Sequence, residues 1–202
     1  MTSAECLKKL HKIRDVAFAT VDAAGMPQVR IIDIMLSDEF GLYFLTARGK
    51  NFHRELAAEG HAAITGMDRN WMMIRLNGLV RRLDDRAWID RMFDANQGMN
   101  EVYPGRTRDI LDPFAVYAGE GEWFSLAKAP IERGSFSFGG AVSPDRGYRI
   151  TGGCIECGSC AANCPESCIT EGSPFVIASR NCVRCGAFRE HCPAGAVEKL
   201  DA

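Results

Sequence analysis

Apolar and polar positions alternate in short runs along the first 140 residues, a pattern that predicts β-strands. The segments VAFATV (16–21) and QVRIIDIML (28–36) are rich in β-branched residues and flank DAAG, which predicts a hairpin. Further strands are expected at GLYFLTA (41–47), HAAITGM (61–67) and WMMIRLNGLVRRL (71–83).

Helices are expected between these strands. Residues 4–15 form the first, because Thr2 and Glu5 have the spacing of a capping box. Residues 51–60 form a second, which ends at Gly60.

The last part of this region predicts one long helix and one more hairpin. The helix covers residues 84–98, with Asp84 or Asp85 as its cap and Gly98 at its end. The hairpin covers residues 113–127 and turns at GEGE. Many short strands without alternating strand–helix units favour a small antiparallel β-barrel with flanking helices over a doubly wound sheet.

Composition narrows the class of protein. The chain of 202 residues is 47% hydrophobic and 25% charged, which is ordinary for a globular protein. Its formal net charge of −2 gives no electrostatic reason to expect nucleic acid as a partner. The polar N-terminal segment does not resemble a secretion signal, and the apolar runs are too short for a membrane span. We therefore expect a cytoplasmic protein without a membrane partner.

Eight of the nine cysteines lie between Cys154 and Cys192, so the chain has two parts. The Gly-, Pro- and Ser-containing stretch 139–147 marks the joint. The predicted domains are 1–140 and 147–202, with 141–146 as the linker. Because cytosolic thiols stay reduced, such dense cysteines bind metal or take part in redox chemistry more often than they form disulfides, and an odd count also disfavours a closed disulfide framework.

The cysteines of the tail form a tandem repeat. The first copy reads Cys154-x2-Cys157-x2-Cys160-x3-Cys164-Pro165, and the second reads Cys182-x2-Cys185-x2-Phe188-x3-Cys192-Pro193. Paired C-x2-C motifs also occur in four-cysteine zinc sites, so zinc is the alternative to an iron–sulfur cluster.

Over residues 148–200 this tail resembles the dicluster ferredoxins of bacteria, a small α+β fold. The resemblance implies that one [4Fe–4S] cluster is held by the thiolates of Cys154, Cys157, Cys160 and Cys192. A second cluster would use Cys164, Cys182 and Cys185, with Cys168 filling the corner that Phe188 leaves. A three-iron [3Fe–4S] cluster, loss of the second site, and a buried free thiol at Cys168 are the alternatives.

Residues 5–138 carry a second resemblance, through FATVDAAGMPQVRIIDIM, LYFLTARGKNFHREL and a strand ending in Gly78 before the long helix. They resemble the split-barrel FMN-binding proteins related to pyridoxamine 5′-phosphate oxidase. The resemblance implies that the flavin phosphate is held by Arg30, Thr46 and Lys50, with Arg48 as a further candidate. It also implies that the backbone of Ile31, Ile32, Asp33 and Ile34 runs beside the isoalloxazine ring.

The second resemblance carries its own alternatives. Members of this family that bind haem, a deazaflavin or no cofactor are the alternatives, and the residues assigned to the phosphate are of types that usually lie on a solvated surface. The oxidase glutamine aligns with Met73, and the oxidase's C-terminal arginine/histidine motif has no counterpart, so oxidation of the vitamer is not expected. The family's FMN site lies across a dimer interface, which implies a homodimer.

The remaining aromatic, histidine and thiol residues have no spacing typical of a site. The tryptophans are expected in core or interface packing, the histidines as surface or structural residues, and Cys6 as a small buried residue.

Together these expectations describe a mainly β split barrel that binds FMN, joined to a ferredoxin-like domain. The predicted activity is electron transfer between the clusters and FMN to reduce an unknown substrate, with a protein or small molecule as redox donor or acceptor. No side chain is nominated as a catalytic acid or base. The alternative is a non-catalytic electron carrier or redox sensor in which the barrel serves for dimerisation.

Overall fold

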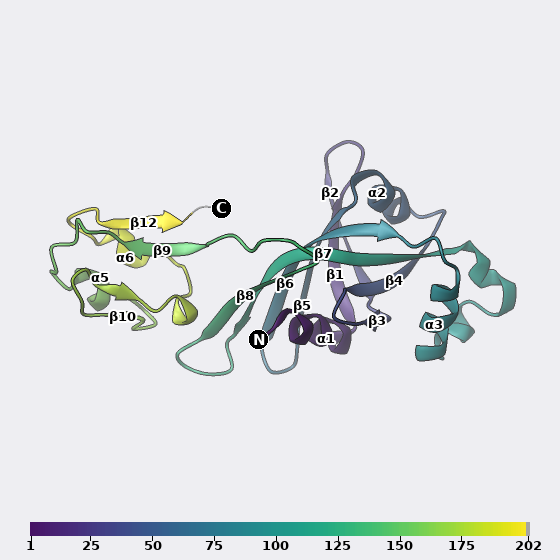
Figure 1. Ribbon diagram of the computed structural model, residues 1–202, viewed down its shortest axis with the longest axis horizontal. Helices are drawn as coiled ribbons and strands as arrows, with labels where there is room; N and C mark the ends of the chain where they lie inside the picture. The colour runs from purple at the N-terminus through teal and green to yellow at the C-terminus, as the bar shows by residue number, and fades with distance from the viewer. Residues whose placement is uncertain (201–202) are drawn as a thin grey trace. The chain divides into compact units, whose positions relative to one another are not determined.

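The computed structural model describes residues 1–200 (Figure 1). Residues 201 and 202, the end of the predicted tail domain, lie outside the described residues. The chain divides into two compact units. The first unit comprises Met1–Asp68, Met73–Trp123 and Ser135–Ser143. The second comprises Arg69–Met72, Phe124–Gly134 and the chain from Pro144 onward, so it takes in two segments that precede the predicted linker.

An antiparallel half-barrel sheet forms the frame of the first unit, as the mainly β prediction requires. Its strand order is β2-β1-β5-β6-β7-β4-β3, and β8 pairs with β7. The strands are β1 (Asp15–Val21), β2 (Pro27–Asp33), β3 (Leu36–Ser37), β4 (Leu42–Ala47), β5 (His61–Met67), β6 (Met72–Arg82), β7 (Leu111–Ser125) and β8 (Glu132–Phe138). The predicted first hairpin is confirmed, since β1 and β2 pair from Asp15↔Asp33 to Val21↔Pro27.

Helices flank this sheet (Figure 1). They are α1 (Ser3–Ile13), α2 (Asn51–Glu59), α3 (Ala87–Ala95), α4 (Met99–Val102) and the 3-10 helix η1 (Gly105–Ile110). The capping box of α1 is confirmed: the Glu5 N–H donates to Thr2 Oγ1 at 3.2 Å, and the Thr2 N–H donates to the Glu5 carboxylate at 2.6 Å. Gly60 ends α2 in the left-handed conformation with φ 64°, as predicted.

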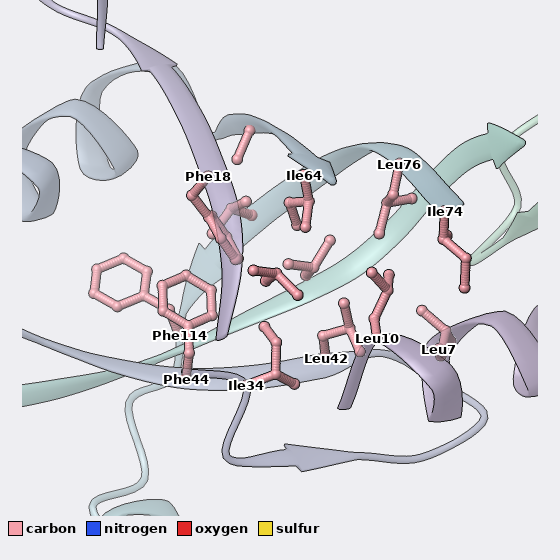
Figure 2. Packing of buried hydrophobic residues seen from close by; sticks show 14 of the residues in the cluster. Leu7, Leu10, Phe18, Ile34, Leu42, Phe44, Ile64, Ile74, Leu76 and Phe114 are labelled. Atoms are coloured by element: carbon pink, nitrogen blue, oxygen red, sulfur yellow. The ribbon is translucent and has the colours of Figure 1, made fainter. Parts of the chain in front are cut away.

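The main core of the first unit is formed by buried side chains of the sheet, α1 and α2, and Figure 2 shows Leu7 and Leu10 of α1 among those of the strands. Phe18 and Phe44 pack with ring centroids 4.9 Å apart, and Phe44 stacks on Phe114 at 5.8 Å. Cys6 on α1 is fully buried in this core, as expected, and burial raises the pKa of its thiol to about 12. Cys6 is therefore an inert apolar residue.

The predicted hairpin at 113–127 is wrong, because β7 runs straight through GEGE and its partner β8 comes later. The two glycines serve close packing and do not form a turn. A Cβ on Gly119 would lie 2.4 Å from the carbonyl oxygen of Asn77, and one on Gly121 would lie 2.2 Å from that of Arg75. The glycines of GEGE therefore indicate a close approach of β7 to β6, and not a turn.

The predicted helix at 84–98 is interrupted. Asp85, one of the two proposed caps, accepts the Ala87 N–H at 2.9 Å near the start of α3. The helix then ends at Asn96, whose buried side-chain amide donates to the carbonyl oxygens of Met35 and Met92 at 2.9 and 2.8 Å. This competing side-chain bond to the backbone ends the helix before Gly98.

The tail from Pro144 contains short elements arranged around two small sheets. These elements are β9 (Gly147–Ile150), α5 (Ser159–Ala162), β10 (Ile169–Thr170), β11 (Val176–Ile177), the 3-10 helix η2 (Ser179–Asn181), α6 (Ala187–Glu190) and β12 (Val197–Leu200). β9 pairs with β12 and β10 with β11, all antiparallel. Phe188 is fully buried at the centre of their core.

No helix within residues 1–200 is long and apolar enough to cross a membrane.

Candidate functional site

An unpaired hydroxyl lies at the end of β4. Thr46 is 3% exposed, and its Oγ1 is buried without a hydrogen-bond partner. The chain then turns through Arg48 to Lys50, whose N–H donates to Ala47 O at 3.0 Å, and enters α2. No side chain caps the start of α2, and Lys50 is exposed there. A helix N-terminus, a cation and a hydroxyl together favour an anion such as a phosphate.

Arg48 is held by acidic and carbonyl groups of the protein. Its Nη1 donates to Asp112 Oδ1 at 3.0 Å and its Nη2 donates to Asp109 O at 2.6 Å. Asp112 is buried and also bonds His53 Nε2 at 2.8 Å. Burial by itself would raise the pKa of Asp112, but the hydrogen bonds from His53 and Arg48 outweigh it, and the pKa is lowered. Arg48 is therefore oriented by an ionised internal partner.

Arg30 on β2 is also partnered. Its Nη2 lies 2.9 Å from Glu55 Oε2, its Nη1 donates to the hydroxyl of Thr20, and that hydroxyl donates to Glu55. The guanidinium lies 4.7 Å from the ring centroid of Phe52. Because Glu55 and Phe52 belong to α2, these contacts fix Arg30 against the helix that follows Lys50. The carboxylate also offsets the charge that Arg30 would present to an anion.

The four residues assigned to the flavin ring lie at the end of β2 and just beyond it. β2 is an edge strand whose one neighbour in the sheet is β1. Ile31 is 64% exposed, whereas Ile34 is fully buried and donates its N–H to Arg14 O at 2.9 Å. Ile32 is partly buried, and Asp33 pairs with the Arg14 guanidinium at 3.0 Å. The outer edge of β2 is thus not covered by another strand of the described chain.

Two hollows are lined in part by the residues that bond Arg30, one by Thr20 and the other by Glu55. The first has a volume of about 570 Å³ and is lined by residues of β1, β5, β6 and β7, among them Thr20, His61 and Asn77. The second, of about 540 Å³, is lined by α2 and the β1–β2 turn, and it brings Glu55 and Arg54 together with further carboxylates. Both volumes lie within the usual range for small-molecule sites.

In the tail, four cysteines line one small pocket: Cys154, Cys157, Cys160 and Cys192. The rest of its lining is apolar side chains and small residues, including Ile150, Phe175 and Val197. The Glu156 N–H donates to Cys154 Sγ at 3.4 Å. These are the four cysteines that the ferredoxin resemblance grouped together, and we name them site 1.

Three of the other tail cysteines also meet. Cys164 Sγ lies 3.4 Å from Cys168 Sγ, and Cys182 lies beside Cys168. All three are buried, whereas Cys185, in the loop after Cys182, is exposed. The Arg184 N–H donates to Cys182 Sγ at 3.3 Å, as the Glu156 N–H does to Cys154 in site 1. We name Cys164, Cys168, Cys182 and Cys185 site 2.

Within residues 1–200, no group of three or more His, Cys, Asp or Glu side chains is arranged to hold a single metal ion as it stands. A tetrahedral zinc site needs sulfurs only about 3.8 Å apart, since Zn–S bonds are about 2.3 Å. A four-iron cube places its thiolates farther apart, because iron and sulfide lie between them. The donor set of site 1, four thiols around an apolar pocket, is chemically suited to such a cube.

Sequence reasoning missed the acidic partners of the candidate residues. Glu55 and Asp112 lie far along the chain from Arg30 and Arg48. Asp112 meets this segment because β7 pairs with β4 in the register Thr46↔Asp112. No local spacing encodes that pairing. His53, expected to be a surface or structural residue, is structural and bonds Asp112.

Comparison with known proteins concerns the first unit. A family model described as pyridoxamine 5′-phosphate oxidase matches residues 2–126. Among solved structures, a NimC/NimA family protein from Clostridium acetobutylicum has 21% identity and a TM-score of 0.58, covering 67% of this chain and 92% of its own. A protein from the same organism, related to general stress protein 26 of the pyridoxinephosphate oxidase family, has 16% identity and a TM-score of 0.52, covering 67% and 95%.

A haem-binding protein from Mycobacterium smegmatis has 14% identity and a TM-score of 0.51, covering 67% of this chain and 58% of its own. At these identities the three structures show the fold alone. The family match ends at residue 126, before the cysteine-rich tail.

Proposed function

Because the chain belongs to the pyridoxamine 5′-phosphate oxidase family, we propose that its barrel binds FMN and that site 1 of its tail holds a [4Fe–4S] cluster. The two cofactors make it an oxidoreductase that passes electrons between the cluster and FMN to reduce a substrate. We place it in the cytoplasm, where its thiols stay reduced, and expect it to work as a homodimer with a protein or small molecule as redox partner.

The observation that carries the flavin assignment is the buried, unpaired hydroxyl of Thr46. Buried polar atoms nearly always have partners, so such an atom marks a place where a polar ligand group binds. The phosphate of FMN supplies acceptors for this hydroxyl, for the Lys50 ammonium and for the start of α2. Arg48 lies in the same turn, and Asp112, which orients its guanidinium, offsets part of its positive charge.

Arg30 and β2 complete the proposed cradle. Arg30 retains donors beyond those used by Glu55 and Thr20, since a guanidinium carries five N–H groups. The open edge of β2 would offer backbone groups of residues 31–33 to the polar rim of the isoalloxazine ring, whereas the N–H of Ile34, just beyond the strand, is already bonded to Arg14 O. When bound, FMN exchanges electrons singly or in pairs, and the protein residues supply binding and orientation.

In the tail, the four thiolates of site 1 would bind the cube, and the Glu156 N–H would donate to one of them. Hydrogen bonds to sulfur are one of the means by which a protein tunes the potential of such a cluster. When bound, the cluster takes up or releases single electrons.

The flavin assignment is tested by titrating the protein with FMN and with riboflavin, which lacks the phosphate. Lys50→Ala should weaken FMN binding by about tenfold to a hundredfold, the equivalent of about 1.5–3 kcal/mol for a charge-assisted bond, and leave riboflavin binding unchanged. The matched control is Lys8→Ala, which removes an exposed ammonium from α1. Equal affinity of the parent protein for FMN and riboflavin would contradict the phosphate site.

Thr46→Val gives a sharper result because its two effects have opposite signs. The variant keeps the shape of the side chain but removes the buried hydroxyl, so the flavin-free protein should be as stable as the parent or more stable. Its affinity for FMN should nevertheless fall. A loss of stability without a change in affinity would show that the hydroxyl has only a structural role.

The cluster assignment is tested on anaerobically prepared protein by assays for iron, acid-labile sulfide and zinc. Cys160→Ala should remove the site 1 cluster, whereas Cys6→Ala, which removes the buried thiol of α1, should leave it intact. Zinc bound in stoichiometric amount without sulfide would refute the cluster.

One structural observation favours the rival function, a non-catalytic carrier or redox sensor. The carboxylate of Glu55 offsets the charge of Arg30, which weakens the case for anion binding at that point. A barrel that binds no flavin, from a protein whose tail is loaded with iron, would support this rival. A Soret band, or binding of a deazaflavin in preference to FMN, would reassign the cofactor.

A further inference from the structure

The two cysteine motifs of the tail are repeated in three dimensions as well as in sequence. Glu156 and Arg184, which are 28 residues apart, both have positive φ, 58° and 59°. Gly158 and Gly186, with the same separation, have φ 75° and 80°. Each glycine precedes a four-residue helix, α5 or α6. The two loops therefore have the same backbone shape, and a residue in one has a structural equivalent in the other.

The copies differ in where they carry sulfur. Cys160 in the first copy is replaced by Phe188 in the second, and Cys168 in the first is replaced by Ala196 in the second. Phe188 is fully buried and packs edge-on against Tyr148 with centroids 5.1 Å apart. The second copy has thus exchanged a sulfur for a core aromatic ring, and the first copy has one sulfur more than the motif requires.

The extra sulfur lies beside two of the thiols that the ferredoxin resemblance assigns to the second cluster. After Cys164 the chain turns sharply: the Ser167 N–H donates to Cys164 O at 3.1 Å, and Ser167 has φ 49°. This turn brings Cys168 Sγ to 3.4 Å from Cys164 Sγ. The Ala178 N–H donates to Cys168 O at 2.8 Å, which fixes the backbone, and Cys182 of the second copy lies against the thiol.

We propose that site 2 is a second iron–sulfur centre in which Cys168 supplies the fourth thiolate in place of Phe188. The eight tail cysteines then divide into two sets of four, Cys154, Cys157, Cys160 and Cys192 in site 1 and Cys164, Cys168, Cys182 and Cys185 in site 2. This inference rests on the proposed function, which assigns a cluster to site 1.

The chemistry needs sulfide and both ferrous and ferric iron, because an oxidised four-iron core contains the two oxidation states of iron in equal amounts; supplying both avoids any further oxidant. Each of the four thiols loses its proton to solvent as its sulfur bonds to iron. Cys164 and Cys168 have to separate their sulfurs to reach different irons, and rotation about χ1 moves each sulfur to another staggered position without a change in the backbone. Three of the four proposed ligands are buried, which excludes water from them, whereas Cys185 is exposed.

The test loads the full chain anaerobically with an equal mixture of ferrous and ferric iron and with sulfide, and counts iron and sulfide per chain. Two four-iron clusters give about eight irons per chain. Cys168→Ala should lower this to about seven, if a three-iron cluster remains, or to about four, if site 2 is lost. Paramagnetic resonance of the reduced protein should lose one of two signals. Cys6→Ala is the matched control and should retain both.

A rescue variant makes the role of Cys168 specific. Adding Phe188→Cys to Cys168→Ala places a thiol at the position equivalent to Cys160 and should restore about eight irons. Removal of a buried ring can unfold the tail, so circular dichroism accompanies this variant, and Cys168→Ala alone decides the matter if the double variant does not fold.

Two results would overturn the inference. One is a parent protein with about four irons that Cys168→Ala leaves unchanged while Cys160→Ala removes them; the proposed function would then stand without a second cluster. The other is a Cys164–Cys168 disulfide in the loaded protein, detected by mass spectrometry. A parent chain with neither iron nor sulfide would instead contradict the proposed function itself.

Discussion

The guanidinium of Arg30 lies 2.9 Å from the carboxylate of Glu55, and the Glu55 side chain is only 6% exposed. A cation that the family resemblance assigns to an external phosphate is thus already paired inside the protein. The pair makes Arg30 part of the packing between β2 and α2, whereas Lys50 has no such structural role.

Arg30→Ala should therefore destabilise the protein far more than Lys50→Ala. Removing Arg30 leaves the buried Glu55 carboxylate without its cation and with only the Thr20 hydroxyl as a partner, which costs about 3–5 kcal/mol. Lys50 is exposed, and its loss should change the free energy of unfolding by about 0.5 kcal/mol or less. Urea unfolding of the flavin-free variants measures both. Equal stability of the two variants would show that the Arg30–Glu55 pair contributes nothing.

Asp112→Asn should make the stability of the barrel less dependent on pH. The pKa of Asp112 is lowered in the folded protein, so its charge stabilises the fold fully above the unfolded pKa of about 3.9. That contribution disappears as the pH falls through the lower folded value. The variant should lose about 1–3 kcal/mol at pH 7 and less near the folded pKa. Unfolding free energies at several pH values test this, and a constant difference would contradict it.

Gly119→Ala should destabilise the sheet, because its Cβ would lie 2.4 Å from Asn77 O on β6. Overpacking of this kind costs about 1–3 kcal/mol. Gly98→Ala is the matched control, since no atom lies within 4 Å of a Cβ at that position. Thermal unfolding of both variants decides whether the glycines of β7 serve close packing. Similar melting temperatures for the two variants would show that β6 and β7 accommodate the added Cβ without a loss of stability.

Cys160→Ala should slow reduction of the flavin by a low-potential one-electron donor if the cluster of site 1 feeds FMN. The covalent joint between the tail and the barrel raises the effective concentration of one cofactor at the other. Rapid mixing of the full chain, loaded with both cofactors, should show the cluster bleaching before the flavin, and the variant should lose the fast flavin phase. Cys6→Ala again serves as the control. If the flavin of Cys160→Ala were reduced at the parental rate, the site 1 cluster would not be the source of electrons for FMN.

Local signals in the sequence were sufficient for the elements that depend on local chemistry. The capping box at Thr2, the stop at Gly60 and the hairpin between β1 and β2 each depend on residues close together in the chain. The grouping of Cys154, Cys157 and Cys160 with the distant Cys192 was implied by the ferredoxin resemblance, and the structure brings these four side chains to one pocket. That they hold a cluster stays a prediction.

The sequence-based predictions failed where contacts with residues far along the chain determine the local secondary structure or the charge balance. GEGE has the composition of a turn, but β6 lies against it and makes it a strand. Residues 84–98 have a helical pattern throughout, but the bond from Asn96 to Met35 O, far back in the chain, ends the helix. The charge balance of Arg30 depends on Glu55 in the same way. Tertiary contacts of this kind override local propensity, and a single sequence does not display them.

The pairing of β9 with β12 has a consequence for synthesis on the ribosome. Ile150 finds its partner in Val197, so the tail cannot close until both strands have left the ribosome. At about 5–20 residues per second, β9 waits roughly 2–10 s with the cysteines between the two strands unprotected. The barrel strands, all of which precede β9, are free to fold during this interval. Oxidants and metal ions that are present during synthesis can therefore react with the exposed thiols of the tail, whereas the barrel is less affected by them.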